Sequence, residues 1–139
     1  MITPYLTFYG DCAAAMAFYE MAFQTAIRMQ QPYGDYVPEG LAVVPPNLSA
    51  WVMHGEMEIG GTVCWFADEA AGVTMGNQIK LTVAVPTKEE AEGIFLRLKE
   101  GTKEITLPPT QTFYSAFHGG LVDRYGMGWN IVCEQGPDT

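Results

Sequence analysis

The sequence predicts an α+β fold of two βαβββ modules that form a cupped mixed sheet with the helices on its outer face. A strand, a tight turn and a helix are indicated over Tyr5–Phe23, and the same order recurs over Lys80–Leu98. Strand patterns outnumber helical ones, and each helix needs a sheet face to cover its apolar side. The opposite face of each sheet is left over, and we expect a pocket where the two left-over faces meet.

The first unit is recognised by a change of hydrophobic period. Leu6 and Phe8 are apolar and alternate with their neighbours, as in a strand with two different faces. Gly10 ends this strand, which is predicted over 1–9. The Asp11 carboxylate is placed to accept hydrogen bonds from the free N–H groups of a helix over 11–23. The apolar stripe of that helix is Ala15, Phe18, Tyr19, Ala22 and Phe23.

The second unit repeats this order. Thr87 and Glu90 form a T-x-x-E capping box, in which each side chain bonds a free backbone N–H of the other residue. The apolar stripe of the second helix is Ala91, Ile94, Phe95 and Leu98. The first four residues of the first stripe precede these four residues by a constant number of positions, and Asp11 precedes Thr87 by the same number. The shared order of strand, cap and stripe indicates an internal duplication.

The rest of the chain shows strands, turns and one long loop. Gly60-Gly61 gives a two-residue hairpin turn, because both glycines tolerate positive φ. Four prolines over Pro32–Leu48 predict a loop, which we interpret as a lid over a pocket, a surface insertion or an arm on a partner subunit. Further strands are predicted over 25–31, 51–59, 62–67, 77–85, 102–107, 112–121 and 127–133.

These elements predict a single domain over 1–139, with module one at 1–68, a linker at 69–76 and module two at 77–139. With 48% hydrophobic residues the chain can bury a sizeable core. The net charge of −9 argues against a nucleic-acid partner, and the absence of a long apolar run argues against a membrane span. Three widely spaced cysteines do not form a disulfide framework, so we expect a reducing cytoplasm.

Polar residues of one parity mark the predicted pocket side of the strands, because helix-facing positions should be apolar. His54 and Glu56 project the same way about 7 Å apart. They fit a metal site, an acid–base pair or a solvated strand face. Lys80 is interpreted either as a pocket cation that binds an anionic ligand or as the ion-pair partner of a carboxylate. The predicted cavity lining is Tyr5, Thr7, His54, Glu56, Cys64, Gln78, Lys80 and Asn130, with Cys64 assigned by context.

Other chemically capable residues are interpreted as structural. As for its chemistry, Cys64 is typical of a small hydrophobe and not of a nucleophile, and Cys12 and Cys133 have no base nearby in the sequence. His118, beside two glycines, is interpreted as structural or exposed. The three tryptophans are assigned to the core: Trp51, Trp65 and Trp129.

Four stretches together resemble the PhnB-like branch of the glyoxalase, bleomycin-resistance and dioxygenase superfamily, which has the vicinal oxygen chelate fold. They are PYLTFYGDCAAAMAFYEMAF, MHGEMEIGGTVCWFAD, TKEEAEGIFLRL and GGLVDRYGMGWNIV, and they cover nearly the whole chain. The patterns Y-L-x-F-x-G-x-x-x-x-A-x-x-F-Y, E-x-x-I-G-G and D-x-x-G-x-x-W are fairly specific when combined. The resemblance implies two βαβββ modules around a cupped sheet, usually in homodimers.

The resemblance also implies where a metal would be held in metal-dependent relatives such as glyoxalase I. The matched positions fall near Pro4 or Tyr5, near Cys64, at Gln78 and at Asn130. None is an ordinary His or carboxylate ligand, so the metal site is predicted to be dismantled and no cofactor is expected. A shift of the fourth-strand alignment by one or two residues would let His54 or Glu56 rebuild part of the site.

Three functions agree with these observations. The first is a metal-free, non-enzymatic homodimer that binds an unknown small molecule in the cupped pocket. The second is a metal-dependent lyase or dioxygenase of the glyoxalase type. The third is a structural dimer without a ligand. The label of demethylubiquinone methyltransferase, which some relatives carry, finds no support, because no Gly-rich loop follows a strand and opens a helix.

Overall fold

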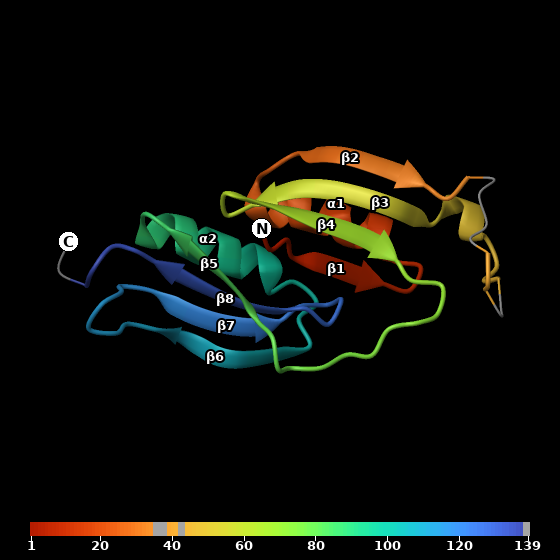
Figure 1. Ribbon diagram of the computed structural model, residues 1–139. Helices are drawn as coiled ribbons and strands as arrows, with labels where there is room; N and C mark the ends of the chain where they lie inside the picture. The colour runs from red at the N-terminus through yellow and green to blue at the C-terminus, as the bar shows by residue number, and fades with distance from the viewer. Residues whose placement is uncertain (35–38, 42–43, 138–139) are drawn as a thin grey trace. The chain divides into compact units, whose positions relative to one another are not determined.

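The computed structural model describes residues 1–34, 39–41 and 44–137, which fold into two compact units, Met1–Thr74 and Met75–Thr139. In each unit one helix packs on a four-stranded mixed sheet (Figure 1). The predicted α+β class and the two βαβββ modules are confirmed. The boundary between the units falls within 69–76, and residues 71–80 are all exposed.

Unit 1 consists of β1 (Tyr5–Phe8), α1 (Cys12–Phe23), β2 (Ile27–Pro32), the short 3-10 helix η1 (Leu48–Ala50), β3 (Val52–Ile59) and β4 (Thr62–Asp68). The strand order is β1-β4-β3-β2, with β1 parallel to β4 and the other pairs antiparallel. The helix α1 packs on β2, β3 and β4. Its predicted stripe is buried at Ala15, Phe18, Tyr19 and Ala22.

Unit 2 consists of β5 (Leu81–Val85), α2 (Lys88–Leu98), β6 (Glu104–Thr110), β7 (His118–Val122) and β8 (Gly128–Cys133). The strand order β5-β8-β7-β6 repeats that of unit 1, again with the first and last strands parallel. The helix α2 packs mainly on β5 and β8. In the described parts of the chain, no helix is long and apolar enough to span a membrane.

The matching topology supports the predicted duplication, but the strands are offset by one residue from the helices. Phe8 corresponds to Val85, because the carbonyl of each accepts a hydrogen bond from the residue that follows its parallel partner strand. The separation between Phe8 and Val85 in the sequence is one residue longer than the separation between equivalent residues of the two helical stripes, such as Ala15 and Ala91. The first turn has two residues before the N-cap position, Tyr9 and Gly10, where the second turn has only Pro86. Gly10 has a φ of +89° and lies close to Trp51, which favours glycine.

The start of α1 is held by Asp68, which corrects the predicted capping role of Asp11. Asp11 occupies the N-cap position, but its side chain makes no capping hydrogen bond. Asp68 is 1% exposed, and its Oδ1 accepts from the N–H groups of Gly10 (2.7 Å) and Cys12 (3.1 Å). Its Oδ2 accepts from the N–H of Val52 at 2.9 Å. One buried carboxylate therefore joins the ends of β4 and β1, the start of α1 and the start of β3.

A second buried carboxylate, Asp123, shapes the β7–β8 hairpin. Its Oδ1 accepts from the N–H groups of Tyr125 (2.8 Å) and Met127 (3.1 Å). Its Oδ2 accepts from the indole N–H of Trp129 at 2.8 Å. Gly126 completes the turn with a φ of +91°. The D-x-x-G-x-x-W pattern is therefore explained by a structural role in this turn.

Several predicted boundaries change in the structure. β1 begins at Tyr5 and not at the first residue, and β5 begins at Leu81 and not at residue 77. β6 continues through Pro108-Pro109, with register shifts that suit an edge strand. One of the two hydrogen bonds of the predicted capping box is confirmed, because Thr87 Oγ1 accepts from the N–H of Glu90 at 3.2 Å.

The predicted loop over Pro32–Leu48 is described in part. Pro32 belongs to β2, and backbone pairing continues from Tyr33 N to Trp51 O at 2.9 Å. Leu48 is buried within η1. The prediction of a lid falls in part on residues 35–38 and 42–43, which lie outside the described residues.

The two aspartates of the first helix start give a matched test. Asp68→Ala should lower the free energy of unfolding by about 3 kcal/mol or more, because it leaves three N–H groups without their acceptor. Asp11→Ala should cost less than about 1 kcal/mol, because only its interaction with the helix dipole is lost. Urea unfolding followed by circular dichroism measures both, with Asp68→Asn expected to be intermediate. Equal losses for the two alanine variants would contradict the assignment.

Candidate functional site

The open face of unit 1 brings together residues from three adjacent strands. In the sheet register Tyr5 on β1 lies beside Trp65 on β4, and Trp65 lies beside Glu56 on β3. Paired residues of neighbouring strands point to the same face, and so do residues two apart on one strand. Thr7 and His54 therefore share this face. The predicted parity is correct for Tyr5, Thr7, His54 and Glu56.

The helix α1 closes the other face of this sheet. A Cβ atom at Gly55 would lie 2.6 Å from the Met16 side chain, so the helix approaches β3 where no side chain intervenes. The rings of Tyr19 and Phe66 meet nearby, with centroids 6.1 Å apart. Side chains of the opposite parity, including His54 and Glu56, consequently point away from α1.

Four side chains form what we call the Trp65 platform: Tyr5, His54, Glu56 and Trp65. The Trp65 ring meets Tyr5 and His54 edge-on, with centroids 6.0 Å and 5.1 Å apart. His54 Nε2 lies 3.0 Å from Glu56 Oε2. Trp65 is 38% exposed and Tyr5 51% exposed. The platform thus presents aromatic surface to solvent beside a pair of hydrogen-bonding groups.

The protonation state of Tyr5 follows from its position on the platform. Partial burial, and then the negative charge of Glu69, raise the pKa of the Tyr5 phenol above its ordinary value. The phenol therefore stays neutral at physiological pH. Its hydroxyl is available as a hydrogen-bond donor rather than as an anionic ligand.

Cys64 does not lie on the open face, and Trp65 does, which reverses the two sequence-based assignments. Cys64 pairs with Met57, and both are buried on the side that α1 covers. Burial also raises the pKa of the Cys64 thiol, which makes a reactive thiolate scarce. The strand TVCWFAD is largely apolar at both parities, so its sequence carried no signal for which face is covered.

The open face of unit 2 is polar instead of aromatic. Asn130 on β8 lies between Thr82 on β5 and Gly120 on β7. A Cβ atom at Gly120 would lie 2.7 Å from Asn130 Oδ1 and 2.8 Å from Thr106 Oγ1. The Asn130 amide and the Thr106 hydroxyl therefore converge over Gly120. Asn130 faces away from α2 as predicted, because its neighbours Trp129 and Ile131 are buried on the helix side.

Gln78 and Lys80 are less closely tied to this face than the sequence predicted. Both are exposed and precede β5, so no strand pairing brings Gln78 beside Asn130. Lys80 lies over β8, where a Cβ atom at Gly128 would be 3.2 Å from its Cγ. No described carboxylate lies within ion-pair distance of Lys80.

His118 belongs to the open face of unit 2, which the sequence interpretation missed. It pairs with Val132, two residues from Asn130, and its Nδ1 lies 3.1 Å from the Tyr114 hydroxyl. Counted through the matching registers of the two sheets, His118 on β7 occupies the position of His54 on β3. His118 is two residues from Gly120 and therefore has the same parity. A strand predicted to begin at His118 would have placed its side chain on the face of Asn130.

The residues present do not fit the metal site that the resemblance implies. At the matched positions Tyr5 is a neutral phenol, Cys64 is on the covered face, and Gln78 and Asn130 are amides. Within each unit, the described residues include no group of three or more His, Cys, Asp or Glu side chains that could hold a metal. First-row metal sites use at least three protein ligands, and the His54 and Glu56 pair supplies two.

Comparisons with known proteins agree with this fold. The family model described as 3-demethylubiquinone-9 3-methyltransferase matches residues 1–132. Protein PA1353 from Pseudomonas aeruginosa is 30% identical, with a TM-score of 0.81 over 97% of this chain and 98% of that one. A PhnB protein from Bacillus cereus is 26% identical, with a TM-score of 0.77 over 95% and 98%. The fosfomycin resistance protein FosX from Listeria monocytogenes, 11% identical with a TM-score of 0.66 over 97% and 93%, shares the fold.

The position of Cys64 can be tested by alkylation. In the native protein at pH 7, iodoacetamide should label Cys64 about a thousandfold more slowly than in urea, because access requires unfolding of the sheet. Mass spectrometry of timed digests measures the rate at each thiol. The equally buried Cys133 provides the internal control. Labelling of native Cys64 at the unfolded rate would place its thiol on an accessible face.

Proposed function

The chain belongs to the family described as 3-demethylubiquinone-9 3-methyltransferase, the PhnB-like branch of the glyoxalase superfamily, and we propose that it binds a ring-containing small molecule without a metal. The Trp65 platform carries this proposal. A ligand ring stacks on Trp65 and meets Tyr5 edge-on, and the exposed surfaces of both side chains supply apolar contact area. His54 and Glu56 then bond polar groups at the edge of the ring and fix its orientation.

The polar face of unit 2 supports the same kind of binding. Asn130, Thr106 and His118 offer donors and acceptors that can bond a neutral or singly charged ligand. The expectation that the two open faces line one pocket stays a prediction.

The methyl-transfer activity in the family's description is not part of the proposal. Nucleoside cofactors are usually held by a Gly-rich loop that follows a strand and opens a helix. Here α1 opens after a turn with one glycine, Gly10, and α2 opens after Pro86. Metal-dependent lyase or dioxygenase chemistry has weaker support than binding, because the ligand set is incomplete among the described residues of either unit.

We further propose that the protein is a cytoplasmic homodimer. β2 ends its sheet with five of its six residues exposed, Met29 among them, and such an edge favours association with another chain. The three buried cysteines are free thiols, which suits a reducing compartment. Light scattering at micromolar concentration should give twice the 15.3 kDa mass of one chain. The mass of a single chain would contradict the dimer.

Ligand binding can be tested through tryptophan fluorescence. A thermal-shift screen of ring-containing compounds should yield one that raises the melting temperature, because it binds only the native state. The same compound should quench the exposed Trp65, whereas Trp129 is 1% exposed and should keep its emission. Trp65→Phe should remove most of the quenching and retain binding. His54→Ala and Glu56→Gln should each weaken binding about tenfold.

Glu89→Gln is the matched control, because Glu89 is an exposed carboxylate in the first turn of α2 in the other unit. It should leave the dissociation constant unchanged. A stoichiometric transition metal in the purified protein would overturn the metal-free proposal. A screen without any stabilising compound would favour a structural dimer.

A further inference from the structure

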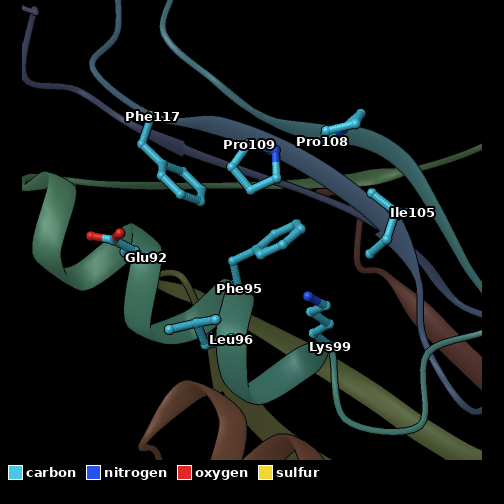
Figure 2. Close-up of a pocket in the computed structure, with 8 residues that line it drawn as sticks. All are labelled: Glu92, Phe95, Leu96, Lys99, Ile105, Pro108, Pro109 and Phe117. Atoms are coloured by element: carbon cyan, nitrogen blue, oxygen red, sulfur yellow. The ribbon is translucent and has the colours of Figure 1, made fainter.

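A second candidate site lies on the α2 side of the sheet of unit 2, the face opposite to Asn130. It is a cavity of about 420 Å³ between α2 and β6. The helix contributes Glu92, Phe95 and Leu96, its C-cap residue is Lys99, the strand contributes Ile105, Pro108 and Pro109, and Phe117 precedes β7 (Figure 2). Small-molecule sites commonly enclose about 300 to 1,000 Å³, so the volume suits a small ligand.

The cavity exists because α2 lies towards one side of its sheet. The helix packs mainly on β5 and β8, which are neighbours at one edge, whereas β6 forms the opposite edge. Phe95 extends from the helix over β7, where a Cβ atom at Gly119 would lie 2.8 Å from its ring. The Phe95 and Phe117 rings meet edge-on at 5.7 Å, and their residues are only 3% and 4% exposed. Two buried aromatic rings therefore form an apolar floor.

The outer wall of the cavity is also apolar. Pro108 and Pro109 lie in β6, and Figure 2 shows the Pro109 ring beside the Phe117 ring and above the Phe95 ring in this view. Proline has no N–H, so this part of the edge strand presents C–H surface without a donor that would need a partner. A ligand ring can pack between the prolines and the phenylalanine floor with dispersion contacts on both sides.

Charge at the ends of the cavity indicates the polarity of the ligand. Glu92 on α2 and its C-cap residue Lys99 are seven residues apart, about 10.5 Å along the helix axis, and lie on the same side as Phe95 and Leu96. In Figure 2 the Lys99 ammonium extends toward the Phe95 ring, whereas the Glu92 carboxylate lies at the Phe117 end and away from that ring. No described carboxylate lies within ion-pair distance of Lys99.

We propose that this cavity binds an apolar monocarboxylate of the size of a phenylalkanoate. Its ring occupies the space between Phe95, Phe117 and the prolines, and its carboxylate pairs with Lys99. One lysine on a chain of net charge −9 suits a single negative charge and not a polyanion. The site is separate from the Trp65 platform, which belongs to unit 1, so the two proposals stand or fall independently.

A charge series on one scaffold tests the proposal. The probes are 4-phenylbutyrate, 4-phenylbutyramide and 4-phenylbutylamine, titrated into ¹⁵N-labelled protein and followed by NMR. We expect shift changes on α2 and β6, with phenylbutyrate binding about tenfold more tightly than the amide and the amine binding most weakly. Lys99→Gln should weaken phenylbutyrate binding about tenfold, to the level of the amide, and leave amide binding unchanged.

Matched variants separate the cavity from general surface charge. Lys88→Gln changes an exposed lysine at the other end of α2 and should leave all three affinities unchanged. Ile105→Trp should fill the cavity and abolish binding of every probe, and Leu96→Trp provides a filling variant at a position that is 62% exposed and tolerates substitution. Equal affinity for the three probes, tightest binding of the amine, shift changes confined to the Trp65 platform, or equal effects of the two Lys→Gln variants would each overturn the proposal.

Discussion

The packing of one helix on one face of each sheet decides where the strand side chains of this protein point. Because side chains alternate along a strand, covering one face commits the other parity to the open face. Glycines make the close packing feasible: Gly55 admits Met16 of α1, and Gly119 admits Phe95 of α2. The open faces are then free of core-packing demands and can carry polar and aromatic groups. The candidate site is in this sense a consequence of how the core is packed.

The two units show how one topology can carry different chemistry. Their strand order and register match, so His54 and His118 occupy equivalent positions. The neighbouring positions differ, because Trp65 on β4 corresponds to Asn130 on β8. The helices differ as well, since α1 packs on β2, β3 and β4, whereas α2 packs mainly on β5 and β8. The displacement of α2 towards one edge leaves space for the cavity in unit 2.

Periodicity predicted the strands, the helices and the duplication, because a 2- or 3.6-residue period is a local property of the sequence. The errors arose where the cause is not local. Asp68 caps α1 from 56 residues away, so spacing near the helix selected Asp11. At Cys64 and Trp65 both parities are apolar, and only the pairing with Met57 and Glu56 settles their faces. The cavity beside α2 depends on the lateral position of a helix, which hydrophobic pattern does not encode.

Without a divalent ion, a ligand site must obtain both affinity and orientation from weaker interactions. The His54–Glu56 pair is partly exposed, so solvent screening leaves it only a modest contribution to affinity. Such a pair contributes more to selecting and orienting a partner. Stacking on an aromatic ring supplies contact area at little entropic cost, because Trp65 is already held edge-on by Tyr5 and His54. Affinity on the open face of unit 1 should therefore follow the aromatic surface of the ligand, and selectivity should follow its hydrogen-bonding edge.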